Sequence, residues 1–172
     1  MKKIQVTIGL QNPKSPTNVG AVLRAAGCFG ASSIYYTGNR YDRAAKFNNY
    51  STDTQNRSES IPLLGVDCLL SKKGDNAKII CIELVEGATP LHKFEHPDDA
   101  YYIFGPEDGT IKQKVIDGAD AVVYIPTIGC LNLAATVNVV LYDRLSKSKD
   151  IDTSNELITE SKDFNNSIKL FC

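Results

Sequence analysis

The stretch AYYIFGPEDG at residues 100–109 decides which class of fold we expect. Its first half is an unbroken apolar and aromatic run, which is typical of a strand buried on both faces. The run stops at Gly105 and Pro106, which favour a turn. Comparable runs that predict strands occupy residues 4–10, 33–37, 77–84 and 121–125.

Helical patterns lie between these runs. After a loop that ends at Pro16, Thr17 or Asn18 can cap a helix that reaches about Phe29. Strands that alternate with helices predict an α/β fold, with a mostly parallel sheet and helices on both faces. Ligands of such sheets bind at the carboxyl ends of the strands, where loops 84–88, 105–109 and 126–130 fall. The other predicted helices span residues 62–70, 111–118 and 131–145.

The expected domain organisation is simple. Residues 1–147 form one domain, and the polar residues 148–172 form a tail that is loose or partly helical around 156–161. Residues 38–60 are polar and predict a long connection, which in a compact domain is usually functional or disordered.

Charge and cysteine content narrow the possible functions. The 172 residues carry a net charge of -1, so nucleic acid would have to bind at a local basic patch. The five cysteines include no C-x-x-C pair, which argues against a disulfide framework or a zinc site and favours the reducing cytoplasm. The first apolar run is too short for a signal peptide or a membrane span, so no membrane partner is expected.

Three segments could carry chemistry. Gly20 and Arg24 are four residues apart, so they share a helix face on which the arginine can reach a ligand; the alternative is a surface arginine beside a tight helix contact. The turn at Gly105 lets the backbone approach a ligand closely, unless it is only a solvated turn. Asn132 lies at the start of an apolar helix, where it is either functional or a cap.

Together and in this order, these segments resemble the three signature motifs of the SpoU/TrmH class of the SPOUT RNA 2′-O-ribose methyltransferases. The family pattern N-x-G-x-x-x-R matches Asn18, Gly20 and Arg24, and the resemblance spans roughly residues 4–147. Thr127 and Cys130 stand where the family usually has methionine and serine, and the loop before Asn132 is shorter than usual. The second and third motifs match Phe104, Gly105 and Glu107, then Ile125, Pro126, Leu131, Asn132, Leu141, Tyr142 and Asp143.

The resemblance implies an enzyme that transfers a methyl group from S-adenosylmethionine to a ribose 2′-hydroxyl. It implies a deep trefoil knot near the C-terminus, a homodimer formed through the knotted end, and a catalytic role for Arg24, either as a fixed cation or as a transient base. It further implies that backbone groups hold the donor. The residues that it assigns are Asn18, Arg24, Glu107 and Asn132 for catalysis and Leu84, Gly105, Ile125, Cys130 and Leu131 for the donor.

A basic patch is the expected RNA contact. Lys14, Arg40, Arg43 and Lys46 can reach phosphates, although a solvated charged loop is the alternative. Aromatic side chains that could stack on bases, and one further cation, are interleaved or near: Tyr41, Phe47, Tyr50 and Arg57.

The sequence leaves the substrate open. Because the chain has no added RNA-binding domain, the resemblance favours tRNA over ribosomal RNA. Two other interpretations are a catalytically idle relative that binds RNA or the donor, and a generic nucleotide-binding domain, for which the glycine-rich signatures are missing.

One further pattern points to a metal but is discounted. Residues 92–96 match the H-x-x-E-H pattern of some zinc peptidases, which requires a helix to place both histidines on one face. Pro90 and Pro97 flank the segment, so a long helix is excluded and no metal is expected.

Overall fold

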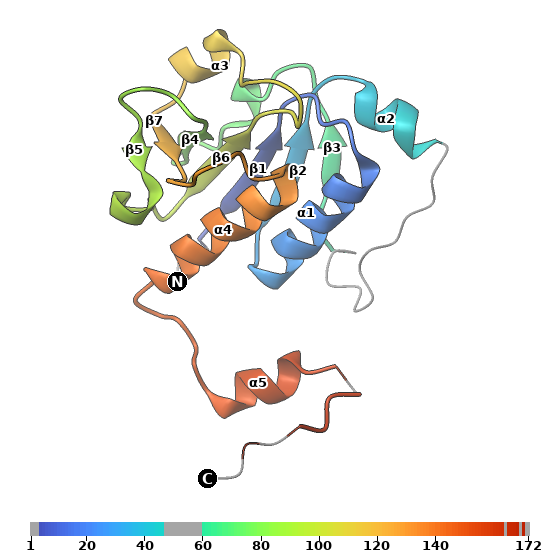
Figure 1. Ribbon diagram of the computed structural model, residues 1–172, viewed down its shortest axis with the longest axis vertical. Helices are drawn as coiled ribbons and strands as arrows, with labels where there is room; N and C mark the ends of the chain where they lie inside the picture. The colour runs from blue at the N-terminus through green and yellow to red at the C-terminus, as the bar shows by residue number, and fades with distance from the viewer. Residues whose placement is uncertain (1–3, 47–59, 164, 169, 171–172) are drawn as a thin grey trace.

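The structure is a computed structural model that describes residues 4–46, 60–163, 165–168 and 170 (Figure 1). Within this part of the chain, seven strands form one sheet in the order β3-β2-β1-β6-β4-β7-β5, and every neighbouring pair is parallel. The predicted α/β class with its parallel sheet is therefore confirmed. The strands are β1 (Val6–Leu10), β2 (Ser33–Tyr36), β3 (Leu63–Gly65), β4 (Lys78–Ile82), β5 (Thr89–Pro90), β6 (Ala100–Phe104) and β7 (Ala121–Tyr124).

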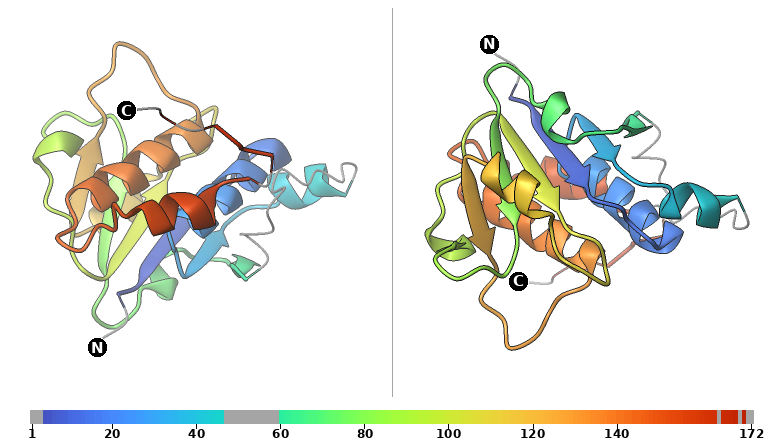
Figure 2. Two further views of the ribbon diagram at one scale, coloured as in Figure 1. Left: turned by 90° about the horizontal axis from the view of Figure 1, so that it is seen from below. Right: turned by 90° about the horizontal axis from the view of Figure 1, so that it is seen from above.

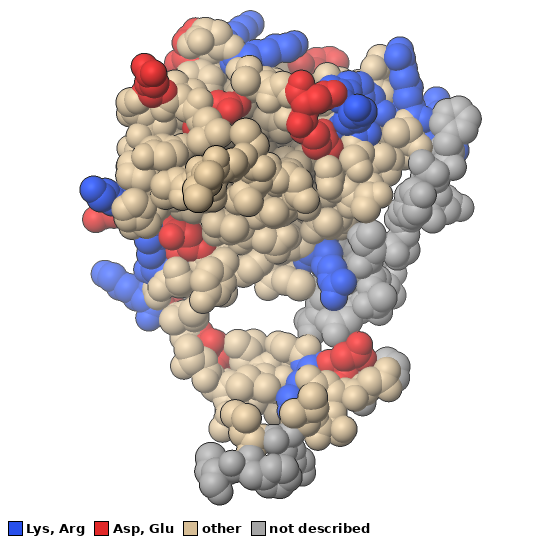
Figure 3. All heavy atoms as spheres, in the orientation of Figure 1, with Lys and Arg blue, Asp and Glu red and all other residues tan. Residues whose placement is uncertain are grey.

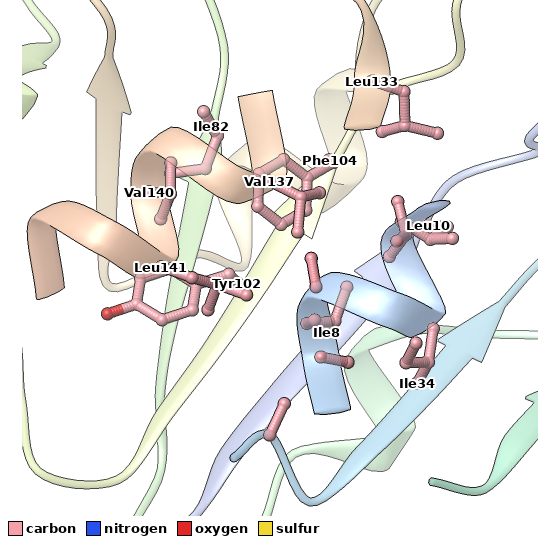
Figure 4. Packing of buried hydrophobic residues seen from close by; sticks show 14 of the residues in the cluster. Ile8, Leu10, Ile34, Ile82, Tyr102, Phe104, Leu133, Val137, Val140 and Leu141 are labelled. Atoms are coloured by element: carbon pink, nitrogen blue, oxygen red, sulfur yellow. The ribbon is translucent and has the colours of Figure 1, made fainter. Parts of the chain in front are cut away.

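Two helices lie side by side on one face of this sheet (Figures 1 and 2). They bury Val22 and Ala26 of α1 and Val137 and Leu141 of α4 against the strands. Figure 4 shows the apolar side chains of α4 directed toward β4 and β6. The helices of the structure are α1 (Pro16–Cys28), α2 (Arg40–Ala45), α3 (Gln113–Asp117), α4 (Leu133–Ser146) and α5 (Asn155–Ser161), with 3-10 turns η1 (Leu70–Lys72) and η2 (Leu91–Lys93).

The opposite face has a smaller core. Ile79, Tyr101 and Ile103 pack there with Leu69, which precedes η1, and with Ile111, which precedes α3. Since β6 is buried along its whole length, it separates the two cores and forms the centre of the molecule. The apolar run at residues 100–104 is therefore the buried strand that the sequence predicted.

Two sequence predictions need correction, and three short elements were missed. The predicted helix at 62–70 is instead β3 followed by η1, because Leu63 pairs with Ile34 at the edge of the sheet. Helix α1 is capped by the Ser15 hydroxyl, not by Thr17 or Asn18, and Pro16 opens the helix. Proline is tolerated at that position because its missing N–H would have no partner within the helix. Short elements α2, η2 and β5 were not predicted.

The C-terminal end of α4 is anchored by a polar cluster around His96. His96 donates from Nε2 to Asp143 (2.8 Å) and accepts the Tyr102 hydroxyl at Nδ1, and Arg144 also reaches that hydroxyl (3.2 Å). Burial lowers the pKa of His96 despite the opposing effect of Asp143, so the neutral ring is favoured. His92 lies exposed in η2, and the described residues contain no group of three potential metal ligands.

The end of the chain does not join either core. Helix α5 buries none of its residues, and Figure 3 shows a gap between it and the body. No helix in the described ranges has the length and apolar character needed to cross a membrane. Cys28, Cys68, Cys81 and Cys130 are free thiols, and Cys172 lies outside the described residues.

Adjacent tyrosines on β6 provide a matched test of the core. The Tyr101 hydroxyl is buried without a hydrogen-bond partner among the described residues, whereas the Tyr102 hydroxyl bonds with His96 and Arg144. A buried hydroxyl without a partner is destabilising, so Tyr101→Phe should raise the free energy of unfolding by about 1 kcal/mol. Tyr102→Phe should lower it by about 1 kcal/mol. Urea denaturation of both variants measures the difference, and equal losses would contradict it.

Candidate functional site

A pocket opens at the carboxyl ends of β4, β6 and β7. It combines the three loops that the sequence placed at strand ends. We call it the first pocket. It is lined by Ile82, Glu83, Leu84, Phe104, Gly105, Pro106, Glu107, Gly109, Tyr124, Ile125, Thr127, Cys130, Leu131, Leu133 and Thr136. All five residues assigned to the donor, Leu84, Gly105, Ile125, Cys130 and Leu131, are in this set.

Gly105 is required by the packing of the loop itself. A Cβ atom at this position would lie 3.3 Å from the Glu83 carboxylate and 3.3 Å from the Ile111 amide nitrogen. The same two groups are joined by a hydrogen bond, in which the Ile111 amide donates to Glu83 over 2.8 Å. The glycine therefore lets the β4 and β6 loops close on each other, which is a different reason from the close approach to a ligand that the sequence suggested.

Glu107 joins the second motif to the first. Its carboxylate accepts hydrogen bonds from the backbone amides of Lys14 (2.8 Å) and Ser15 (3.0 Å) and from the Asn18 side-chain amide (3.1 Å). Helix α1 has no acidic residue in its own first turn, so Glu107 supplies the negative charge that favours a helix N-terminus. Asn18 is thus held beside the pocket through Glu107, although it is not a lining residue.

These contacts determine the charge state of Glu107. Partial burial alone would raise the pKa of this carboxyl, but the hydrogen bonds from Ser15, Asn18 and Lys14 together lower it below its ordinary value. The side chain is therefore an anion at neutral pH, and it accepts hydrogen bonds from three groups.

Asn132 is the N-cap of α4. Its side-chain oxygen accepts the Ala135 amide hydrogen at 2.7 Å, so the capping alternative describes this side chain in the structure. Its neighbours Leu131 and Leu133 both line the first pocket, which places Asn132 at the rim. The loop before it is stabilised by a hydrogen bond from the Thr127 hydroxyl to the Gly129 carbonyl (2.6 Å).

Arg24 lies farther away on the same helix as Asn18. It is exposed, and it is absent from the described residues that line the first pocket. Six residues of α-helix separate it from Asn18, a distance of about 9 Å along the axis. Within one chain, the structure therefore brings the three motifs together through Asn18, Glu107 and the α4 start but leaves Arg24 outside the pocket.

The expected RNA patch is only partly assembled. Arg40 forms a bidentate pair with Asp108, with both N–O distances 2.8 Å, and Lys14 Nζ lies 3.6 Å from the same carboxylate. The Arg40 contact lowers the pKa of Asp108. Arg43 and Lys46 are exposed at the end of α2. Of the remaining expected residues, Phe47, Tyr50 and Arg57 lie outside the described residues, whereas Tyr41 packs edge-on against Tyr36.

A family model matches this combination of motifs and fold. The model describes the SpoU rRNA Methylase family and matches residues 5–142, which include the three motifs up to Tyr142. The chain belongs to this SpoU family. Members of the family are S-adenosylmethionine-dependent RNA 2′-O-ribose methyltransferases. A comparison with curated proteins found no match.

Solved structures share the SpoU fold at low sequence identity. A TrmH/SpoU tRNA modifying enzyme from A. aeolicus is 19% identical with a TM-score of 0.73, covering 92% of this chain and 86% of that one. A structure described as giving insights into 2-OH methylation of C/U34 on tRNA is 21% identical, with a TM-score of 0.65 and coverages of 85% and 92%. An AdoMet-bound rRNA methyltransferase from Sinorhizobium meliloti is 17% identical, with a TM-score of 0.64; 84% of this chain matches 57% of that longer chain.

Sequence reasoning missed several residues of this SpoU site. Glu83, Tyr124 and Thr136 line the first pocket, and Ser15 anchors Glu107. Glu83 could have been found, because it directly follows a buried strand at the ligand-binding edge of the sheet. Thr136 could not, since its position depends on how α4 enters from the third loop.

The neighbouring carboxylates Glu107 and Asp108 allow a matched test of the site's assembly. Glu107→Ala removes three hydrogen bonds to an anion and should lower the free energy of unfolding by about 2 kcal/mol, after allowance for partial exposure. Asp108→Ala removes only an exposed ion pair and should have little effect. Because the pKa of Glu107 is lowered, its contribution should be present at neutral pH and fade as the pH falls below 4.5. Denaturation between pH 7 and 3 measures this, and equal stability of the two variants would contradict it.

Proposed function

We propose that this SpoU protein transfers a methyl group from S-adenosylmethionine to a ribose 2′-hydroxyl of RNA, with tRNA as the substrate. The observation that carries the proposal is the first pocket, where all five residues assigned to the donor lie together beside Glu107. Ribosomal RNA is the second candidate substrate, and a catalytically idle relative that binds RNA or the donor is the third interpretation.

Two of the similar structures support the choice of tRNA, because their descriptions name tRNA and the match covers most of each of them. This chain spans 86% of the A. aeolicus tRNA modifying enzyme and 92% of the protein described for C/U34 of tRNA. It spans only 57% of the S. meliloti rRNA methyltransferase, which therefore carries additional sequence.

The residues of the first pocket fit the donor. Apolar side chains of Leu84, Ile125 and Leu131 can enclose an adenosine ring, and the backbone near Gly105 and Cys130 offers hydrogen-bonding groups whatever the side chains are. The donor supplies a methyl group on a positively charged sulfur. A pocket beside an anionic carboxylate such as Glu107 suits a bound cation.

The remaining chemistry falls to Arg24, with Asn18, Glu107 and Asn132 around it. The target hydroxyl must give up its proton to a base or to water, and the bond from the methyl carbon to the donor sulfur must break as the bond to the ribose oxygen forms. A guanidinium can stabilise the alkoxide as it forms, or transiently take the proton if its surroundings allow. Glu107 holds the Asn18 amide in place, so these two residues position the first motif against the pocket.

A homodimer is part of the proposal, because Arg24 lies outside the pocket of its own chain. Apolar side chains are exposed on α4 and its preceding loop, which is typical of an interface. They are Ile128, Leu131, Val139, Tyr142 and Leu145.

We further propose that the chain passes through the family's trefoil knot where the loop after β7 leads into α4. Residues 1–147 form the methyltransferase domain in this proposal, and the enzyme acts in the cytoplasm.

Donor binding is the first test. Isothermal titration calorimetry with S-adenosylmethionine should show one site per chain, and Cys130→Ser should bind with similar affinity because backbone groups make the contacts. Mass spectrometry of tRNA from a deletion strain should then lack one 2′-O-methyl nucleotide. Absence of donor binding, or an unchanged set of 2′-O-methyl nucleotides in both tRNA and rRNA, would contradict the proposal.

A variant of Arg24 distinguishes donor binding from methyl transfer. Arg24→Ala should bind the donor as the wild type does but lose methyl transfer by about 100-fold or more, since it removes the charge that stabilises the reacting oxygen. The control is Lys93→Ala, which removes an exposed cation in η2 outside the first pocket and should leave methyl transfer unchanged. Single-turnover transfer of labelled methyl measures both variants, and full turnover by Arg24→Ala would exclude either role.

A further inference from the structure

A second pocket opens on the same carboxyl edge of the sheet, on the other side of the 105–112 loop. It lies at the ends of β1, β2 and β3 and is bounded by α3. The second pocket is lined by Gln11, Asn12, Thr37, Gly38, Asn39, Gly65 through Leu70, Lys112, Lys114 and Val115. None of the four residues assigned to catalysis or the five assigned to the donor contributes to this lining.

The walls of the second pocket are held together by specific contacts. The Asn12 amide donates to the Thr37 hydroxyl (3.3 Å), and the Asn12 side chain fills the space beside Gly38, where a Cβ would collide with its oxygen. Both Asn12 (φ 46) and Gly38 (φ 80) have left-handed backbone conformations. The β1 and β2 loops are therefore interlocked, and the pocket is formed before any ligand arrives.

Gln11 keeps the two pockets apart. Its side-chain amide donates to the Thr110 carbonyl (3.0 Å) and accepts the Lys112 amide hydrogen (2.9 Å). It is 5% exposed, one of two buried polar or charged side chains among the described residues. Gln11 therefore holds the 105–112 loop, which separates the two pockets, from the side of the second pocket.

The lining has the chemistry of a nucleotide site. Apolar Val66, Leu69 and Val115 offer a surface for the face of a base. Asn39 and Thr37 offer hydrogen-bonding groups, and the Asp67 carboxylate can accept from a base amino group.

Two lysines at the rim are available for phosphate. Among the described residues, no hydrogen bond or ion pair engages the Nζ atom of Lys112 or Lys114, and both lie at the start of α3. Figure 3 shows basic and acidic side chains interspersed along this upper edge of the molecule. Lys112 and Lys114 therefore provide a local pair of positive charges in a protein whose net charge is -1.

The Arg40–Asp108 pair lies between the two pockets. Arg40 directly follows Asn39 of the second pocket, and Asp108 lies between Glu107 and Gly109 of the first. The pair is exposed and bidentate, the geometry in which a guanidinium also binds phosphate. An RNA strand that passes from one pocket to the other crosses this pair.

We propose that the second pocket binds the nucleotide next to the methylated one in a single-stranded segment of the RNA. Its base lies on the apolar floor, its outer phosphate contacts Lys112 and Lys114, and the phosphate between the two nucleotides takes the place of Asp108 on Arg40. This inference rests on the proposed function, since it assigns a neighbouring subsite to the same RNA. Asp108 then acts as a competitor that RNA must displace.

The test uses a fluorescein-labelled ten-nucleotide oligocytidylate, whose amino groups match Asp67, with binding measured by fluorescence anisotropy. The double substitution Lys112→Glu and Lys114→Glu should weaken binding at least about fivefold and reduce the slope of log affinity against log salt by about 0.7, for one phosphate that is no longer neutralised. Lys93→Glu, an exposed lysine in η2 outside both pockets, should change affinity less than about twofold. A double variant that binds like the wild type, or equal losses in the control, overturns the inference.

Two further measurements distinguish a specific nucleotide-binding site from non-specific electrostatic attraction. Asp108→Asn should bind the probe about threefold more tightly, because the competing charge is gone. Hydrogen–deuterium exchange of the wild type with the probe should show protection at residues 37–39 and 65–70; protection confined to the first pocket's loops overturns the inference. Donor calorimetry on the double variant verifies its fold and separates the two claims. If the wild type binds the donor but the lysine substitutions leave RNA binding unchanged, only the inference about the second pocket is overturned. If the wild type does not bind the donor, the proposed function itself is contradicted.

Discussion

The Glu107 carboxylate is the contact on which the arrangement of the site depends. It belongs to the loop after the central buried strand, yet all three donors it accepts come from the segment that opens α1, some ninety residues earlier in the chain. This anion joins the first motif to the second, and the packing of α1 beside α4, which begins at the third motif, brings the third motif to the same edge of the sheet. The same bonds keep Glu107 ionised, so its structural role and its charge have one cause.

Much of the fold was predictable because buried strands have characteristic runs of apolar residues in the sequence. The β6 run at residues 100–104 is apolar at every position, which only a strand covered on both faces requires. Edge elements leave weaker marks. Leu64 of β3 is 51% exposed, and the strand has only three residues, so local pattern alone could not separate it from a helix. Its identity comes from pairing with β2, a contact between distant segments.

The candidate site was predictable in part for the same reason. Loops at the ends of parallel strands meet at one edge, so the sequence alone could group Leu84, Gly105 and Ile125. The reason for Gly105 was not predictable, because it depends on Glu83 and Ile111 from two other segments. The spacing of Asn18 and Arg24 in the sequence also could not show that only Asn18 contacts Glu107. That contact depends on where the start of α1 lies relative to the loop after β6.

Electrostatics explains why such a site requires shaped pockets. With 19 basic and 20 acidic residues, the protein has no net attraction for RNA, and several of its cations are already paired, as Arg40 is with Asp108 and Lys147 with Asp143. Paired surface cations contribute little to phosphate binding until the partner is displaced. On the proposed function, affinity then comes from base contacts and from cations such as Lys112 and Lys114, whose Nζ atoms no hydrogen bond or ion pair engages among the described residues. An enzyme with little net charge would then select RNA by the shape of an unpaired segment more than by its charge.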